Sequence, residues 1–402
     1  MTDTTQSIGQ GNEKVRLKLT ISMYILFFTY AFSLTMAGPL IPVYIKQFGI
    51  SLDQGGLIST FQGFGGIIGV FAGVFFSDRI KKSSIIRVSF IVYTLAVLVL
   101  SFTSLFTVLL VLFFIIGAST KTLDAAANAN VADLNRHRRG FYLNLLHATF
   151  GLGAFAGPLL STAFVKMNMP PNMAFKALGV LCIITFIQYI VIFRKTSDEA
   201  KRETVTDKTS IKVFLKSGKL LLLCMLPFLY LGISSSISNW MPTFLQHNLQ
   251  SDPLFSTMPV TAFWLGVIAG RVAYSVIQEK IPTRKLLIIC NVTGGAVFVV
   301  AVLLQIPGLI IGACMLTGLF TGAFNPIAVA TASSLFPKNT GIVSSFIFFS
   351  ASIGQMLFPW LLGMLTNVVD FSVSLSLIGV LTLVSAVFLG VIPAERKHQP
   401  QE

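Results

Sequence analysis

The sequence predicts an all-α membrane protein of twelve transmembrane helices, arranged as two six-helix bundles related by a parallel repeat. Three observations predict this fold class. Of the 402 residues, 54% are hydrophobic and only 11% are charged, whereas an average soluble domain has about 25% charged residues. Apolar stretches of about 20 residues, long enough to span a bilayer, recur along the whole chain. A weak internal repeat relates the first half of the chain to the second.

Twelve apolar stretches, separated by polar or turn-forming breaks, define the predicted helices. They cover residues 19–45, 54–77, 84–103, 105–133, 140–165, 173–193, 219–243, 254–277, 284–304, 307–335, 340–366 and 371–392. The breaks around Ser104 and at Gln305–Gly308 are only a few residues long. Because the number of helices is even, both chain ends are expected on the same side of the membrane.

The longest polar break divides the chain near its centre and predicts the domain organisation. The expected parts are an N-terminal tail, a six-helix bundle, a linker, a second six-helix bundle and a C-terminal tail, at residues 1–18, 19–193, 194–218, 219–392 and 393–402. The first eighteen residues are polar and contain no apolar core. We therefore expect the first helix to be retained as a span, with no signal peptide before it.

The distribution of basic residues predicts the orientation in the membrane. Of the 29 Lys and Arg residues, 24 fall in the two tails and in the loops on the side of the termini. Three fall on the opposite side, and Lys121 and Arg271 lie within helices. Since short cytoplasmic loops carry an excess of Lys and Arg, both termini are expected in the cytoplasm of a multi-pass cell-membrane protein. The same distribution explains the net charge of +14 without a nucleic-acid partner.

The internal repeat appears when the chain is compared with itself at a shift of about 200 residues. At a shift of 200, three residues of helix 1 match three of helix 7, namely Phe28, Tyr30 and Pro42 with Phe228, Tyr230 and Pro242. At a shift of 201, Asp124 meets Asn325, so this polar position is ionisable in only one half. A parallel repeat of this kind favours a substrate site near the membrane midplane between the halves.

Asp124 is the main candidate for chemistry, because it is the acidic residue clearly placed in the middle of a predicted helix. A charge within the bilayer is costly unless it is paired or hydrated, and is a functional-site hypothesis by default. We expect Asp124 to bind a coupled proton. Lys121 lies three residues earlier on the same helix face, and is expected to contact substrate or, alternatively, to form a static ion pair with Asp124. His147, on helix 5, lies at a similar depth and suits proton exchange, although a packing role is the alternative.

Neutral polar side chains on the predicted helices could bind an uncharged part of a solute. The candidate substrate-binding residues, besides Lys121, are Asn128, Asn144, Asn239, Trp240, Asn325, Gln355 and Gln62. Trp240 could instead anchor its helix at the membrane surface. Asp78, Arg79 and Arg271 are expected to act in structural gating rather than in substrate binding. Neither metal-ligand spacing nor a catalytic constellation is present, so no metal, cofactor or enzymatic activity is expected.

Several motifs resemble the major facilitator family of transporters. Asp78-Arg79-x-Lys81-Lys82 resembles the loop 2–3 signature of that family, with Lys81 where glycine is usual. Leu123-Asp124-Ala125-Ala126-Ala127-Asn128 and Leu143-Asn144-Leu145-Leu146-His147 resemble helices 4 and 5 of its fucose–proton symporter branch, which includes bacterial glucose/mannose permeases and sodium-dependent glucose transporters. Phe263-Trp264-x-Gly266 through Gly270-Arg271 also resembles the glucose/mannose permeases. The resemblance implies that Asp124 is the coupling or sugar-binding acid, with Asn128, Asn144 and His147 near the substrate.

Together these features predict a secondary active transporter that moves a small polar solute, a sugar or related metabolite, by alternating access. The expected partners are that solute, a coupled proton or sodium ion, and membrane lipids, and the chain is expected to be a monomer. Efflux of drugs or metabolites on the same fold is an alternative, since 36 Phe residues are compatible with an aromatic pocket. A receptor or membrane enzyme is a further alternative, and no extramembrane domain supports it.

Overall fold

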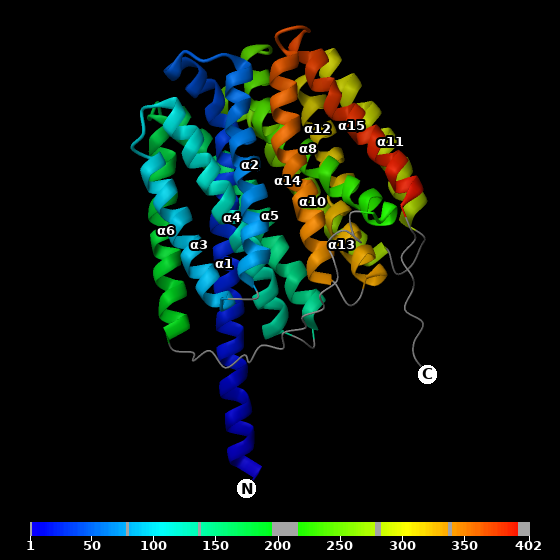
Figure 1. Ribbon diagram of the computed structural model, residues 1–402. Coiled ribbons are helices and arrows are strands. Elements are labelled where there is room, and N and C mark those ends of the chain that lie inside the picture. The colour runs from blue at the N-terminus through cyan, green and yellow to red at the C-terminus, as the bar shows by residue number, and fades with distance from the viewer. Residues whose placement is uncertain are drawn as a thin grey trace.

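The twelve predicted membrane spans are present in the structure. A computed structural model describes residues 2–77, 80–135, 138–194, 216–277, 283–336 and 340–392. Within these ranges the chain forms helices joined by short turns, and twelve spans are long and apolar enough to cross a membrane. Figure 1 shows the helices of the first and second halves of the chain as two neighbouring groups. The predicted all-α fold class is therefore confirmed.

The helices of the first half follow the predicted spans to within a few residues, apart from the start of the first. They are α1 (Thr2–Phe48), α2 (Leu52–Ser77), α3 (Lys82–Leu100), α4 (Phe106–Leu134), α5 (Arg139–Lys166) and α6 (Pro171–Arg194). α1 includes most of the predicted N-terminal tail, and Figure 1 shows this part projecting beyond the bundle. We call the face of the molecule at which α1 enters the bundle the terminal face, and the opposite face the far face.

The second half contains six spans, two of which are interrupted. Its helices are α8 (Gly218–His247), α9 (Pro253–Ser256), α10 (Met258–Ile277), α11 (Thr283–Leu304), α12 (Pro307–Thr321), α13 (Phe324–Leu335), α14 (Thr340–Leu365) and α15 (Phe371–Val391). α9 and α10 together form the predicted span 254–277, and α12 and α13 form the span 307–335. Each of these two spans was predicted as one continuous helix.

Proline explains the position of the break between α12 and α13. Pro326 has no backbone N–H and cannot donate to the carbonyl four residues earlier, which belongs to Gly322. Gly322 lies in the break, between Thr321 at the end of α12 and Phe324 at the start of α13. A backbone carbonyl without a helical donor inside a membrane needs another partner, and the site described below provides one.

The two halves repeat the same helix packing. In the first half α1 packs on α5, α2 on α4 and α3 on α6, and in the second half α8 packs on α14, α10 on α12 and α11 on α15. The contacts between the halves also come in a symmetric pair, α2 with α14 and α5 with α10, and α1 contacts its counterpart α8. This arrangement confirms the parallel repeat of two six-helix bundles.

The two bundles close tightly against each other toward the far face. A Cβ atom at Gly38 of α1 would lie only 1.7 Å from the backbone oxygen of Ser238 on α8, so the crossing requires glycine. Every residue from Ser236 to Leu245 of α8 is buried. The Asn239 amide also donates a hydrogen bond to the Ser59 hydroxyl of α2, across the bundle interface. The structure is therefore a conformation in which the far side of the bundle interface is shut.

Candidate functional site

The Asp124 carboxylate lies on α4 and is held by two neutral donors. It lies ten residues before the helix end at Leu134, or roughly 15 Å along the axis at 1.5 Å per residue. Asn128, one helical turn later, donates from Nδ2 to Asp124 Oδ1 over 2.8 Å. The Tyr30 hydroxyl of α1 forms a second hydrogen bond with the carboxylate. The structure thus brings Asp124 and Asn128 together as their spacing predicts, and adds Tyr30, which sequence reasoning noted only in the repeat.

Lys121 lies beside Asp124 without forming an ion pair with it. Within the described part of the chain no salt bridge joins the two side chains, although their charges are close enough to interact. Both residues line a cavity between the bundles, and its other walls come from α2 and α14 through Val70, Ser345 and Phe348. The volume of about 20 Å³ leaves room for roughly one water molecule. The alternative of a static Lys121–Asp124 pair finds no support in this conformation.

His147 of α5 belongs to the same region and is part of a series of aromatic contacts. Its ring packs edge-on against Phe27 at 6.1 Å between centroids, and the charges of Lys121 and Arg271 both act on it. Tyr30 contacts Phe150 at 5.6 Å, and Phe150 contacts Trp264 of α10 at 5.8 Å. These contacts connect Asp124, through Tyr30, to the second bundle. Trp264 was noted only as a family motif residue and Phe150 was not singled out, because helical spacing alone does not show which face meets the partner bundle.

Arg271 of α10 binds the backbone carbonyl of Gly322, to which Pro326 cannot donate a hydrogen bond. Its Nε donates to the Gly322 oxygen over 3.2 Å, where the α12–α13 break leaves that oxygen without a helical donor. Nη2 donates to the Tyr230 hydroxyl over 3.3 Å. Nη1 donates to the His147 backbone oxygen of α5 over 3.2 Å, which joins the two bundles. The structural part of the prediction for Arg271 agrees with these contacts, and its gating role stays a prediction.

Three other predicted residues are polar groups at buried or half-buried positions of the helices. Gln62 of α2 is 3% exposed, and its Nε2 has no hydrogen-bond partner among the described residues. Asn325, at the start of α13, has a buried Oδ1 without such a partner. The buried indole nitrogen of Trp264 also lacks one. Gln355 of α14 is half-buried. Unpaired polar atoms inside a membrane protein are costly, which makes these atoms candidates for hydrogen bonds to a solute.

Asn239 and Trp240 lie in a different place, at the closed far side of the interface. The Trp240 side chain is fully buried, its Nε1 donates to the Pro359 oxygen of α14 over 2.8 Å, and its ring packs against Phe371. Asn239 is bound to Ser59. In this conformation both side chains hold helices together rather than facing a cavity, and neither is at the molecular surface. Their predicted contact with substrate stays a prediction.

Some predicted residues lie outside the described structure. Asp78 and Arg79 fall between the described ranges, and the side chain of Asn144 is likewise not described. Close to the first two, Lys82 at the start of α3 forms an ion pair with Asp133 near the end of α4. This contact at the terminal face was not predicted, because Lys82 and Asp133 are 51 residues apart in the sequence.

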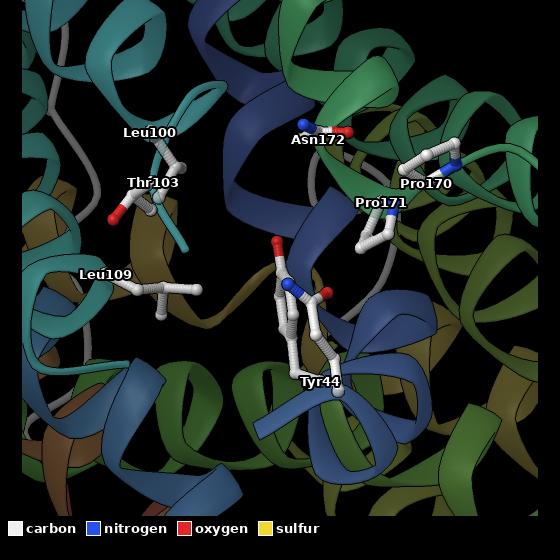
Figure 2. Close-up of a pocket in the computed structure, with 8 residues that line it drawn as sticks. Tyr44, Leu100, Thr103, Leu109, Pro170, Pro171 and Asn172 are labelled. Atoms are coloured by element: carbon white, nitrogen blue, oxygen red, sulfur yellow. The ribbon is translucent and has the colours of Figure 1, made fainter. Parts of the chain in front are cut away.

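A larger cavity, of about 140 Å³, lies at the far face within the first bundle. Figure 2 shows Tyr44 of α1 facing an opening bounded by Leu109, Pro171 and Asn172. The residues that line it contain no ionisable group that titrates near neutral pH, and all of them come from one bundle. The smaller cavity at Asp124 contains the charged residues and touches both bundles, and we take it as the candidate transport site. The described residues contain no cluster of metal ligands.

Comparison with known proteins identifies the family. The model of the Major Facilitator Superfamily matches residues 23–258 and 223–402. This chain belongs to the Major Facilitator Superfamily. It is a multi-pass membrane transporter and not an enzyme, as predicted from its fold and from the absence of a catalytic constellation.

Curated relatives of this major facilitator protein are similar over most of its length. It is 25% identical to the "Glucose/mannose transporter GlcP" of Bacillus subtilis (strain 168), over 94% of this chain and 95% of the relative. It is 21% identical to the "Protein TsgA homolog" of Buchnera aphidicola subsp. Baizongia pistaciae (strain Bp), over 82% and 84%. The "Uncharacterized MFS-type transporter YfkF" of Bacillus subtilis is 24% identical over about half of each chain, 51% in both cases.

Proposed function

We propose that this protein is a proton-coupled transporter that takes up a sugar or a related metabolite by alternating access. Its two bundles, residues 19–193 and 219–392, would rock about the site at Asp124, and both termini would lie in the cytoplasm of the cell membrane. The excess of Lys and Arg at the terminal face supports this orientation. With the far side shut, the structure then corresponds to a conformation that is closed to the outside of the cell.

The observation that carries the proposal is the environment of Asp124. Its carboxylate faces a cavity between the bundles and is held by Tyr30 and Asn128, without an ion pair to Lys121. Neutral donors oppose protonation of a carboxylate less strongly than a direct cationic partner does. Because a charge is costly within the membrane, a proton on Asp124 would ease the passage of the loaded carrier between its two states.

The sugar assignment is supported by the neutral polar groups and by similarity. Gln62, Asn325 and Trp264 present buried hydrogen-bonding atoms that no described residue uses, and Trp264 with Phe150 adds an aromatic face. Hydroxyl-rich solutes are bound by such polar groups beside aromatic surfaces. The relative from Bacillus subtilis that is 25% identical is named a glucose/mannose transporter, which is compatible with this class of solute.

Transport in proteoliposomes tests the coupling role of Asp124. An inward proton gradient should drive accumulation of the solute by the wild-type protein, and Asp124→Asn should abolish accumulation while solute counterflow continues. Asp370→Asn is the matched control, because it changes a carboxylate to an amide at the first residue before α15, where asparagine also caps a helix well. Equal accumulation by the wild type and Asp124→Asn would refute the proposal.

The same preparation tests the direction of transport, for which efflux is the alternative. An outward-facing cavity of drug size would favour efflux, and the cavity at Asp124 is only about 20 Å³ in this conformation. If solute moves out of the vesicles against its gradient as protons move in, the protein is an exporter. Movement of solute and protons in the same direction supports uptake.

A further inference from the structure

The charges of the candidate site do not balance. In the middle of the described membrane spans, the basic side chains are Lys121 and Arg271, and the acidic one is Asp124. The hydrogen bonds of Arg271 all go to neutral acceptors, which are two backbone oxygens and the Tyr230 hydroxyl. No carboxylate among the described residues therefore neutralises Arg271, and the region has one positive charge more than negative ones.

Lys121 is the cation of this site that has no hydrogen-bond or ion-pair partner among the described residues. Asp124 is bound by Tyr30 and Asn128, and Lys121 forms neither a hydrogen bond nor an ion pair with any described residue. Its ammonium lies beside a cavity that has room for roughly one water molecule. An ammonium in such a place costs several kcal/mol unless an anion or water compensates it. The available space provides little water, and the negative charge of Asp124, which acts on Lys121, is lost when that acid takes up the coupled proton. An anionic group of the solute is then the effective partner.

A glycine on the neighbouring helix α2 leaves room for the Lys121 side chain. A Cβ atom at Gly66 of α2 would lie 3.2 Å from Lys121 Cγ and 3.5 Å from the Ser352 hydroxyl of α14. The missing side chain at Gly66 thus leaves space for the lysine stem where α2, α4 and α14 meet. Lys121 precedes Asp124 by three residues, so it lies about 4.5 Å farther from the terminal face. A solute that enters from that face would pass Asp124 and meet Lys121 beyond it.

We infer that the transported solute carries a negative charge, and that Lys121 binds its carboxylate. A sugar acid or a similarly sized hydroxylated carboxylate matches this chemistry once the bundles part, because its hydroxyl groups need neutral polar partners such as the unpaired atoms of Gln62, Asn325 and Trp264. This inference rests on the proposed function and narrows its substrate class from sugars in general to their anionic derivatives. A monoanion that moves together with one proton on Asp124 transfers no net charge across the membrane.

Matched pairs of neutral and anionic sugars test the inference by thermal shift of the purified protein. The probes are D-glucose with D-glucuronate, and D-galactose with D-galacturonate, which differ only at carbon 6. At least one uronate should stabilise the wild-type protein at concentrations at which its hexose does not. Lys121→Gln should weaken that binding about 10- to 100-fold, since a hydrogen bond to a charged group contributes about 1.5–3 kcal/mol, whereas Lys121→Arg should largely retain it.

Lys176→Gln is the control, because this lysine lies over the Phe102 ring in the first bundle, away from the site. The ligand-free melting temperature of each variant separates loss of binding from loss of folding. Stabilisation by hexoses as strong as by uronates, no stabilisation by either, or unchanged uronate binding in folded Lys121→Gln would each overturn the inference.

A second measurement separates this inference from the proposed function. In proteoliposomes with a potassium gradient and valinomycin, proton-driven uptake of the uronate should be the same with and without a negative interior potential. Uptake accelerated by that potential would show that a net positive charge moves, as with a neutral sugar and one proton, and would overturn the anionic assignment. Proton coupling would still stand in that case, because it depends on Asp124→Asn.

Discussion

Tyr30 links the Asp124 carboxylate of α4 to another helix. The second half of the repeat has a tyrosine at the equivalent position. Tyr30 of α1 binds Asp124, and its counterpart Tyr230 of α8 binds Arg271. The same tyrosine position thus supports an acid in one half and a base in the other. Rocking of the bundles would move α1 with α4, since both belong to the first bundle, so the Tyr30 bond is expected to persist through the transport cycle.

Removing the Tyr30 hydroxyl should therefore impair coupling rather than folding. A hydrogen bond to a charged group contributes about 1.5–3 kcal/mol, and without it the unprotonated carrier is less stable within the membrane. We expect Tyr30→Phe to lower gradient-driven accumulation about tenfold, at about 1.4 kcal/mol per factor of ten, while counterflow stays within about twofold. Tyr230→Phe, which leaves Asp124 untouched, is the control. Equal accumulation by the two variants would argue against this role of Tyr30.

Residue contacts within one helix were predictable, and contacts between helices were not. Asn128 follows Asp124 by four residues, which places them together on any α-helix. The same rule placed Lys121 near Asp124. It could not show that the carboxylate binds Tyr30 rather than Lys121. For that, the rotation of α1 against α4 is needed, and the sequence does not contain it. Trp240 illustrates the same limit, because its burial depends on α14 and on Phe371.

At the scale of a helix, the break between α12 and α13 is caused by Pro326 and stabilised by Arg271. Pro326 removes the donor for the Gly322 oxygen, and Arg271 replaces it. Losing Arg271 should leave that oxygen unpaired at a cost of about 1–3 kcal/mol. We expect Arg271→Met to lower the melting temperature of the purified protein, and Pro326→Ala in the same chain to restore much of the loss by supplying the missing N–H.

The rescue distinguishes this role from a general loss of a buried charge. Pro326→Ala in the wild-type background is the control, since there the new N–H competes with Arg271 for the same oxygen. If the double variant melts no higher than Arg271→Met, the Gly322 bond does not explain the contribution of Arg271. The hydropathy pattern identified the span 307–335 but not this break, because the residues directly on both sides of Gly322 are mostly apolar.

At the scale of the molecule, the two bundles meet along a symmetric interface that is shut on one side. α2 with α14 and α5 with α10 form the equivalent contacts, and α1 crosses α8 at Gly38. Alternating access requires these far-side contacts to separate while the bundles stay folded. The repeat in the sequence predicted the two bundles and their parallel relation. It could not predict which side is shut, because both conformations are built from the same residues.

Locking the far side should stop transport reversibly. The hydrogen bond between Asn239 and Ser59 joins the bundles there. We therefore expect cysteines at the two positions to come close enough for a disulfide, which needs Cα atoms less than about 7 Å apart. We expect oxidation of the Ser59→Cys/Asn239→Cys protein to abolish counterflow and a reductant to restore it, because the disulfide prevents the bundles from parting. Each single variant is a control under the same oxidant. These controls also show whether oxidation of a native cysteine affects transport; Cys182, Cys224 and Cys314 are buried, and Cys290 is partly buried. Full counterflow in a cross-linked protein would mean that these helices do not separate during transport, and would contradict the assignment of this side as a gate.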